Sequence, residues 1–202
     1  MTLFLFFFFG SIVGSYFETT NQRIARDDNL IFDTNKRFLR SQCDDCKREL
    51  SWLDLFPIFS FLLLKGKCRY CKKPIKIDHL ISEFLFGLIF CLLILSDNSL
   101  NLILTIPFFS FLFAIALFDY KYFLIPKIYL LFFILISFFS LYFEGSLTNI
   151  IFASVMTSTV FIAKQIMDRL MKRETLGNGD LFLIFGLGFF HPPLEFSFTL
   201  LL

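Results

Sequence analysis

Two aspartates stand beside long apolar runs, where a charged side chain is costly. Asp119 follows the apolar run at residues 114–118, and Asp180 precedes another at residues 181–185. Ionisable groups at membrane depth cost several kcal/mol to insert, and they commonly mark a reactive site or an ion path. Two carboxyl groups near one membrane face could form an acid–base pair, in which one holds a proton while the other acts as a base.

A structural interpretation of both aspartates is also open. Asp119 could be a helix-end residue near Lys121, and Asp180 could cap the start of the last helix. The catalytic interpretation also gives a role to Gly177 and Gly179, which precede Asp180. Because glycine has no side chain, these two positions would let a substrate backbone come close to Asp180.

The composition predicts a membrane protein with several spans. Hydrophobic residues make up 56% of the 202 residues, Phe alone accounts for 33, and the mean hydropathy is +0.72. A water-soluble domain of this length does not need so much apolar surface. We therefore predict an all-α fold, a polytopic bundle of membrane helices. Its six apolar segments are Thr2 to Tyr16 or beyond, Leu80–Leu95, Leu100–Phe118, Ile128–Phe143, Leu147–Met167 and a last segment from Leu181.

One long polar segment carries most of the positive charge. Of the 19 Lys and Arg residues, 13 lie between Arg23 and Lys76. The positive-inside tendency places this segment in the cytoplasm and the N-terminus outside, so the turns at 119–127 and 168–180 also face the cytoplasm. The first apolar segment lacks the basic stretch and the small-residue cleavage site of a signal peptide, and we predict that it is retained as a span.

The polar segment contains two Cys-x-x-Cys pairs. Cys43 and Cys46 form the first, and Cys68 and Cys71 form the second. This spacing suits a tetrahedral zinc site of four thiolates, and the surrounding Lys and Arg side chains would favour the thiolate form. Zinc could supply much of the folding energy of a loop with little apolar core. Two disulfides or a redox-active dithiol are the alternatives, and a reducing cytoplasm disfavours disulfides.

Together with these features, the order and spacing of several motifs resemble one known family, the type IV prepilin peptidases, which are membrane aspartic enzymes of the Gly-x-Gly-Asp class. A lone Gly-x-Gly-Asp would be a weak signal, whereas an ordered set along nearly the whole chain is specific. The motifs are Gly14-Ser15-Tyr16-Phe17 with Arg23, Arg40-Ser41-Gln42-Cys43-Asp44-Asp45-Cys46, Trp52-Leu53-Asp54 with Pro57-Ile58-Phe59-Ser60, Gly66-Lys67-Cys68-Arg69-Tyr70-Cys71-Lys72-Lys73-Pro74-Ile75, Glu83, Asp119 with Ile125-Pro126, and Glu174 with Gly177-Asn178-Gly179-Asp180.

The resemblance implies removal of a basic leader from a type IV prepilin or a pseudopilin at the cytoplasmic face of the bacterial inner membrane. Asp119 and Asp180 would be the catalytic pair, one activating a water against the scissile carbonyl and the other assisting departure of the amine. The resemblance also implies methylation of the new N-terminal amine, with S-adenosylmethionine as methyl donor. The expected partners are therefore prepilin or pseudopilin substrates and the lipid bilayer, and nothing in the sequence suggests nucleic-acid recognition.

This interpretation divides the chain into three parts. Residues 1–22 are expected to be the first transmembrane segment, residues 23–78 a cytoplasmic four-cysteine zinc-binding loop, and residues 79–202 a transmembrane aspartic peptidase core. The core is expected to be incomplete at its C-terminal end, because the apolar stretch that would begin the next span, Phe196–Leu202, is too short to cross a bilayer. The chain departs from the family pattern at Phe182, where Lys is usual, Lys127, where Asp is frequent, Glu18, where Asn is usual, and Ala25, where Pro is usual.

Three other polar residues lie near predicted span ends. We expect Glu18 to be a solvated helix-end residue and His79 to be a polar residue at the membrane interface. Glu83 has two open interpretations: a solvated helix end, or a side chain that orients the amine or contacts the methyl donor.

Two functional hypotheses from different classes stay open. One is an intramembrane aspartic endopeptidase that also transfers a methyl group, and the other is a non-catalytic zinc-binding membrane scaffold. A proton or ion carrier built on the paired acids would need a polar path across the membrane, and the apolar spans show almost no polar stripe.

Overall fold

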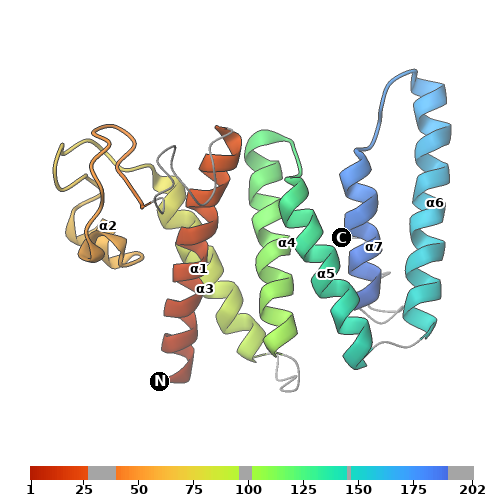
Figure 1. The fold of residues 1–202 in the computed structure, drawn as a ribbon, viewed down its shortest axis with the longest axis horizontal. Helices are drawn as coiled ribbons and strands as arrows, with labels where there is room; N and C mark the ends of the chain where they lie inside the picture. Colours follow the sequence, from red (N-terminus) through yellow and green to blue (C-terminus); the bar gives the residue numbers. More distant parts are fainter. Residues whose placement is uncertain (27–39, 96–101, 145–146, 191–202) are drawn as a thin grey trace. The chain divides into compact units, whose positions relative to one another are not determined.

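The computed structural model of the chain describes residues 1–26, 40–95, 102–144 and 147–190 (Figure 1). Each of the six predicted apolar segments forms a helix, so the all-α prediction is confirmed. The stretch expected to begin a further span, Phe196–Leu202, lies outside the described residues. The helices in chain order are α1 (Thr2–Ala25), the 3-10 helix η1 (Trp52–Leu55), α2 (Phe59–Leu63), α3 (Ile77–Leu95), α4 (Leu102–Tyr122), α5 (Lys127–Glu144), α6 (Leu147–Met171) and α7 (Asn178–Phe190).

Among the described helices, α1, α3, α4 and α6 are long and apolar enough to cross a membrane. The apolar parts of α5 and α7 are shorter, at Lys127–Ser140 and Asn178–Gly188. These lengths agree with a polytopic membrane protein, since about 20 apolar residues span the hydrocarbon core of a bilayer.

The chain folds as two compact units, Met1–Ile106 and Pro107–Leu202. In the first unit, α1 and α3 pack closely and antiparallel through two glycines at Gly-x-x-x-Gly spacing, which lets membrane helices approach. A Cβ at Gly10 would lie 2.6 Å from the carbonyl oxygen of Phe86, and a Cβ at Gly14 would lie 2.7 Å from that of Ser82. One turn farther along α1, the rings of Phe17 and Phe86 stack at 5.5 Å.

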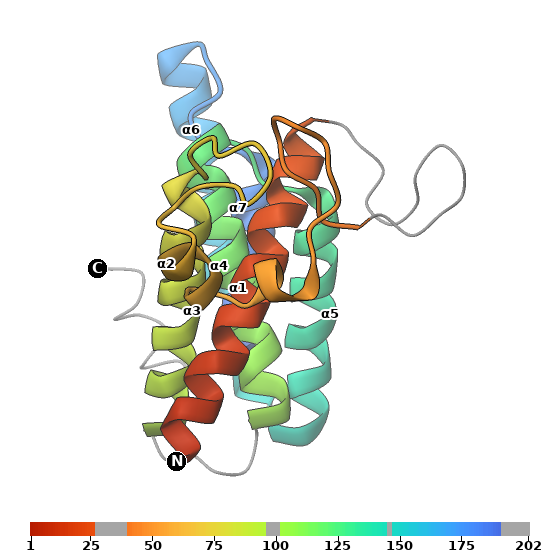
Figure 2. The same cartoon turned by 90° about the vertical axis from the view of Figure 1, so that its left-hand side faces the viewer.

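The segment between α1 and α3 contains η1, α2 and the four cysteines. Ser51 and Asp54 form a capping box at the start of η1, in which the Asp54 carboxylate accepts a hydrogen bond from the Ser51 N–H at 3.2 Å. Figure 2 shows α2 beside the middle of α1, and the rings of Phe8 and Phe56 lie 6.0 Å apart. This part of the segment therefore lies along α1 and not beyond its polar end.

In the second unit, α5 packs against α4 on one side and α7 on the other, and α7 also packs against α6 (Figure 1). The ring centroids of Phe108 and Phe133 are 4.9 Å apart. Glycines allow α7 to approach both neighbours, because a Cβ at Gly186 would lie 2.6 Å from the Phe133 ring and one at Gly188 would lie 2.7 Å from the Ala153 Cβ. The helix ends that carry Asp119 and Asp180 thus belong to one compact unit.

Candidate functional site

Asp119 lies in the last turn of α4, and its side chain is exposed. Its carbonyl oxygen accepts a hydrogen bond from the Phe123 N–H at 2.8 Å. Phe123 adopts a left-handed backbone conformation, with φ 54°, that ends the helix. The chain then passes Ile125 and Pro126 before α5 begins at Lys127. Asp119 is therefore held at a helix end by regular backbone structure, in accord with the helix-end part of the structural interpretation.

Asp180 lies in the first turn of α7, where its carboxylate accepts a hydrogen bond from the Gly177 N–H at 3.1 Å. Asp180 is the third residue of α7, and its carboxylate satisfies the N–H of Gly177, the residue just before the helix. This bond is the second half of a capping box. The sequence-based alternative placed Asp180 at the cap position itself. The structure gives it the same stabilising role from within the first turn.

Gly179 brings the two aspartate-bearing helix ends together. A Cβ at Gly179 would lie 3.1 Å from Cδ1 and 3.3 Å from Cβ of Ile125, which lies in the α4–α5 connection six positions after Asp119. A Cβ at Gly177 would lie 3.2 Å from the Asp180 Oδ2. The absence of side chains at these positions makes room for the protein's own Ile125 and Asp180 side chains, and the predicted approach of a substrate backbone stays a prediction.

The connection between α6 and α7 is fixed by side chains that the sequence interpretation did not include. Asp168 Oδ1 accepts hydrogen bonds from both the N–H and the hydroxyl of Thr175, each at 2.7 Å. Lys164 Nζ donates to the Asn178 side-chain oxygen at 2.5 Å. These bonds join the end of α6 to the residues just before Asp180. The available sequence signal was an acidic residue directly after the apolar segment Leu147–Met167.

The geometry thus brings the two aspartate motifs into one region of the second unit. In the described part of the chain, no hydrogen bond joins the carboxyl groups of Asp119 and Asp180. Their action as a proton-sharing pair remains a prediction.

The two Cys-x-x-Cys pairs form equivalent backbone hairpins in the first unit. In the first, the Cys43 N–H donates to the Arg48 carbonyl at 3.0 Å, and in the second the Cys68 N–H donates to the Lys73 carbonyl at 2.9 Å. Lys47 and Lys72 occupy matching left-handed positions, with φ 55° and 59°. Bridges between residues 42 and 49 and between residues 67 and 74 close the hairpins. Each hairpin therefore presents its two sulphurs from one tight turn.

The four sulphurs are close enough to share one metal ion. The Sγ atoms of Cys43, Cys46, Cys68 and Cys71 all lie within 4.8 Å of one another, and Cys43 and Cys71 are 3.8 Å apart. A tetrahedral zinc ion with Zn–S bonds of about 2.3 Å separates its sulphur ligands by about 3.8 Å. The donor set and its spacing thus fit zinc. The fifth cysteine, Cys91, lies apart in α3, where its thiol donates to the Leu3 carbonyl at 3.4 Å.

The backbone around the cluster affects the acidity of its thiols. Burial would raise the pKa of Cys68, but hydrogen bonds from the N–H groups of Cys71 and Tyr70 outweigh it and lower this pKa to about 7. The Lys73 N–H lowers the pKa of Cys71, but burial and the neighbouring sulphurs raise it to about 11. The cluster therefore combines a thiol that ionises readily with one that holds its proton until a metal displaces it.

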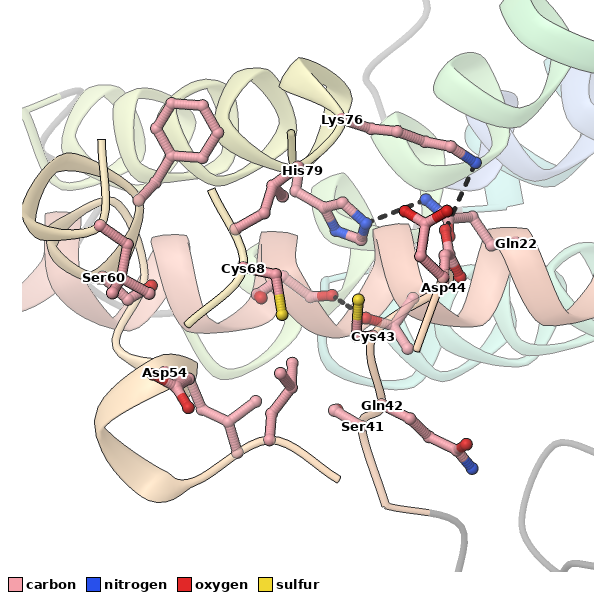
Figure 3. Close-up of a pocket in the computed structure, with 18 of the residues that line it drawn as sticks. Gln22, Ser41, Gln42, Cys43, Asp44, Asp54, Ser60, Cys68, Lys76 and His79 are labelled. Carbon is pink, nitrogen blue, oxygen red and sulfur yellow. Dashed lines mark hydrogen bonds and ion pairs between the residues drawn. The ribbon is translucent and has the colours of Figure 1, made fainter. Parts of the chain in front are cut away.

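A cavity of about 330 Å³ lies between the C-terminal half of α1, the cysteine hairpins and the start of α3 (Figure 3). On one side, the Gln22 Nε2 lies 3.0 Å from the His79 Nε2. On another, Asp44 forms ion pairs with Arg26 at 2.9 Å and Lys76 at 3.4 Å. The cavity is within the size range of small-molecule sites and presents acidic, basic and amide groups.

Two acids near this cavity are buried, which corrects one expectation. Glu18 is 1% exposed and accepts a hydrogen bond from Gln22 at 3.1 Å, so the expectation that it is a solvated helix-end residue is wrong. Glu83 is 8% exposed, and its carboxylate accepts the Ile58 N–H at 2.7 Å. The solvated interpretation of Glu83 is therefore also wrong. The contact between Ile58 and Glu83 joins segments 25 positions apart, and it has no signal in the local sequence.

Two protein-family models match nearly the whole chain. The model of the bacterial peptidase A24 N-terminal domain matches residues 8–97, and the model of the type IV leader peptidase family matches residues 106–202. The second match begins at residue 106, which is also where the first compact unit ends. The two units thus correspond to two family domains.

Three curated relatives that match the chain are named prepilin leader peptidase/N-methyltransferase. The protein of Vibrio cholerae serotype O1 is 27% identical over 194 residues, covering 92% of this chain and 76% of that protein. The Bacillus subtilis protein is 34% identical over 131 residues, 64% of this chain and 50% of that protein. The Myxococcus xanthus protein is 26% identical over 91% of this chain and 54% of that protein, so the chain spans about half the length of the latter two relatives. No solved structure matched the chain significantly.

Proposed function

The chain belongs to the bacterial A24 peptidases, the type IV leader peptidase family, and from this premise we propose that it removes the basic leader from type IV prepilins or pseudopilins. The single observation that supports an active centre is the contact between Ile125 and Gly179. It joins the α4–α5 connection, which follows Asp119, to the first turn of α7, which holds Asp180. Carboxyl groups from two helix ends could therefore act on one peptide bond.

The proposed chemistry is aspartic catalysis. One carboxylate of the pair Asp119 and Asp180 accepts a proton from a water molecule, which attacks the scissile carbonyl. The other carboxyl group donates a hydrogen bond to that carbonyl oxygen and assists departure of the amine. Two such groups titrate as one unit, so the two roles belong to the pair and not to one named residue.

We propose that Cys43, Cys46, Cys68 and Cys71 hold a structural zinc ion. When bound, zinc would link the two hairpins through coordination by their four sulphurs, and this link would take the place of an apolar core. The segment is held to α3 by the hydrogen bond from the Ile58 N–H to Glu83, and the first hairpin is held to the end of α1 by the ion pair between Arg26 and Asp44. Zinc would therefore stabilise the segment without taking part in cleavage.

We further propose that the cavity of the first unit takes the methyl donor S-adenosylmethionine. This donor supplies a methyl group to the substrate's new N-terminal amine. Its charged amino-acid moiety and its adenine need both acidic and basic partners, and the cavity offers the buried carboxylate of Glu83, the amide of Gln22 and the imidazole of His79. The protein would be placed in the inner membrane, with the N-terminus outside and the cysteine hairpins in the cytoplasm.

Cleavage of a purified prepilin in membranes that contain the protein tests this function. Separate Asp119→Asn and Asp180→Asn variants should each lose cleavage at unchanged abundance. The matched control is Glu49→Gln, which removes an exposed carboxylate paired with Arg40 in the first unit and should cleave at the wild-type rate. Full cleavage by either aspartate variant would overturn aspartic catalysis, and absence of cleavage by the wild type would favour the non-catalytic scaffold.

A further inference from the structure

We propose that residues 52–63, which form η1, α2 and the turn between them, enter the bilayer beside α1 and α3 and contact lipid acyl chains. This segment belongs to the stretch between the first two spans, which its positive charge places in the cytoplasm as a whole. The structure gives these residues surroundings unlike those of the cysteine hairpins on either side.

The segment exposes an unusual density of large apolar side chains. Trp52 is 80% exposed and Leu63 is 83% exposed. Five further side chains are exposed between them: Leu53, Leu55, Phe56, Phe59 and Leu62. Contiguous exposed apolar surface on a soluble loop marks an interaction site. Trp, Phe and Leu are also the residues by which interfacial helices enter a bilayer.

The position of the segment along α1 indicates which medium surrounds it. Phe56 packs against Phe8, with ring centroids 6.0 Å apart. Phe8 precedes Glu18, the first charged residue of α1, by ten residues, which is about 15 Å along a helix axis. Because the hydrocarbon core of a bilayer is about 30 Å thick, this contact lies near mid-membrane if α1 spans it. Figure 2 shows α2 farther along, level with the middle of α1 and thus between this contact and the polar end of the helix.

The backbone of the segment is prepared for a medium without water. Non-helical backbone is tolerated at membrane depth where its polar groups are satisfied by the protein. Ile58, whose φ of 62° lies outside the helical range, donates its N–H to the buried Glu83 of α3 at 2.7 Å. Backbone hydrogen bonds of 2.8–3.0 Å continue along α2 and the turn after it. In these bonds the N–H groups of Ser60, Leu62, Leu64 and Gly66 donate to the carbonyl oxygens of Phe56, Ile58, Ser60 and Phe61, respectively.

The charged groups in and around the segment also agree with its entry into the bilayer. The Asp54 side chain is 3% exposed and accepts a hydrogen bond from Arg69 Nε at 2.8 Å. Its charge is therefore paired and kept from the apolar surface. The next charged residues, Lys65 and Lys67, follow α2 directly, and lysine at a segment end can extend its ammonium group to the headgroup region.

The exposed apolar surface of residues 52–63 is continuous with that of the spans α1 and α3, and this favours lipid over a protein partner. Exposed apolar side chains of α1 and α3, among them Phe9, Ile12, Phe84 and Leu88, are themselves suited to acyl chains. The segment is fixed to these spans by the Phe8 and Glu83 contacts, so its apolar side chains extend the apolar surface that the spans present.

The protein carries its own probe, since Trp52 is its single tryptophan. The full chain is reconstituted into phosphatidylcholine vesicles whose acyl chains are brominated at known depths, and Trp52 fluorescence is compared with that in unbrominated vesicles. We expect a blue-shifted emission that loses most of its intensity in brominated lipid and little on addition of aqueous iodide. A red-shifted emission that iodide quenches and brominated lipid does not would overturn the proposal. Protection from both quenchers would also overturn it, because another copy or a protein partner would then cover the segment.

A matched control places the tryptophan in the cysteine hairpins. In a Trp52→Phe, Tyr70→Trp double variant, the probe takes the place of an exposed ring over which Arg48 stacks at 4.9 Å. We expect iodide to quench this probe and brominated lipid to leave it unchanged. Equal quenching of both positions by lipid would mean that the whole loop lies on the membrane, and would overturn entry of residues 52–63 alone. The zinc content of each variant, equal to that of the wild type, reports correct folding.

Discussion

Ile125 lies against Gly179, so that a Cβ at residue 179 would sit 3.1 Å from the Ile125 Cδ1. This contact spans the α4–α5 connection and the first turn of α7. The two aspartate-bearing helix ends can lie this close because residue 179 is glycine and has no Cβ atom.

We predict that Gly179→Ala lowers cleavage several-fold. The added methyl group must displace Ile125 by a few tenths of an ångström, and overpacking of this kind costs about 1 kcal/mol or more. Because α4 and α7 are fixed by separate helix contacts, the displacement is expected to alter the site more than the abundance of the protein. The measurement is prepilin cleavage rate, normalised to protein level in the membrane.

The double variant Ile125→Val, Gly179→Ala provides the control. Valine lacks the Cδ1 atom nearest the new methyl group and should restore much of the lost rate. Ile125→Val alone should cleave nearly as the wild type does. If the double variant is as impaired as Gly179→Ala, the Ile125 contact is not the reason for glycine at this position.

Asp180 combines a proposed catalytic role with an observed structural one, and two substitutions separate them. Asn at residue 180 keeps an oxygen that can accept the Gly177 N–H, whereas Ala removes it. We predict that both variants lose cleavage, but that only Asp180→Ala is also destabilised, by about 1 kcal/mol as for other capping losses. Thermal unfolding in detergent measures the difference. Equal stability of the two variants would show that the capping bond contributes nothing, and wild-type cleavage by Asp180→Asn would contradict the catalytic role.

The cysteine cluster predicts about one zinc ion per chain. Cys68→Ser should abolish stoichiometric zinc binding and lower the amount of protein in the membrane, because the hairpins have little other core. Cys91→Ser is the matched control, since Cys91 lies outside the cluster, and should keep both zinc and abundance. Elemental analysis of the purified proteins decides the point. Full zinc content in Cys68→Ser would contradict a site of four cysteines.

Features that depend on local spacing of residues could be predicted from the sequence. Each cysteine pair is bound by its own tight turn, and so the Cys-x-x-Cys pattern alone predicted hairpins that present sulphur. The aspartates were identifiable because each borders an apolar run. Close packing of α1 on α3 also had a local signal, the spacing of Gly10 and Gly14, which the sequence interpretation did not use.

Contacts between distant segments could not be predicted in this way. Glu18 was expected to be solvated because it lies near the end of the first predicted span, yet it is 1% exposed. Likewise, Ile125 and Gly179 are 54 positions apart, and neither carries a pattern that identifies the other. In both cases the deciding free energy comes from tertiary packing, which local propensity does not encode.

The ion pair between Asp54 and Arg69 predicts a pH-dependent part of the stability. Burial would raise the pKa of Asp54, but hydrogen bonds from Ser51 and the guanidinium of Arg69 outweigh it, so this pKa lies below its ordinary value. A carboxyl group with a lowered folded-state pKa stabilises the fold above its unfolded-state pKa of about 3.9, and the contribution is lost as pH falls through the folded-state pKa. We predict that Asp54→Asn is less stable than the wild type by about 1–2 kcal/mol at pH 7, as for hydrogen bonds to charged groups.

The difference between the two proteins should shrink as the pH is lowered below about 4, since the wild-type carboxyl group is then protonated as well. Acid also releases zinc from both proteins. Because the two proteins are compared at the same pH, the effect of zinc loss on stability cancels in their difference. Unfolding in detergent at each pH, followed by Trp52 fluorescence, gives the measurement, because Trp52 lies two residues from Asp54 in η1. A stability difference that stays constant from pH 7 to acid would contradict an ionised Asp54 as its source, and would leave the shape of the side chain as the cause.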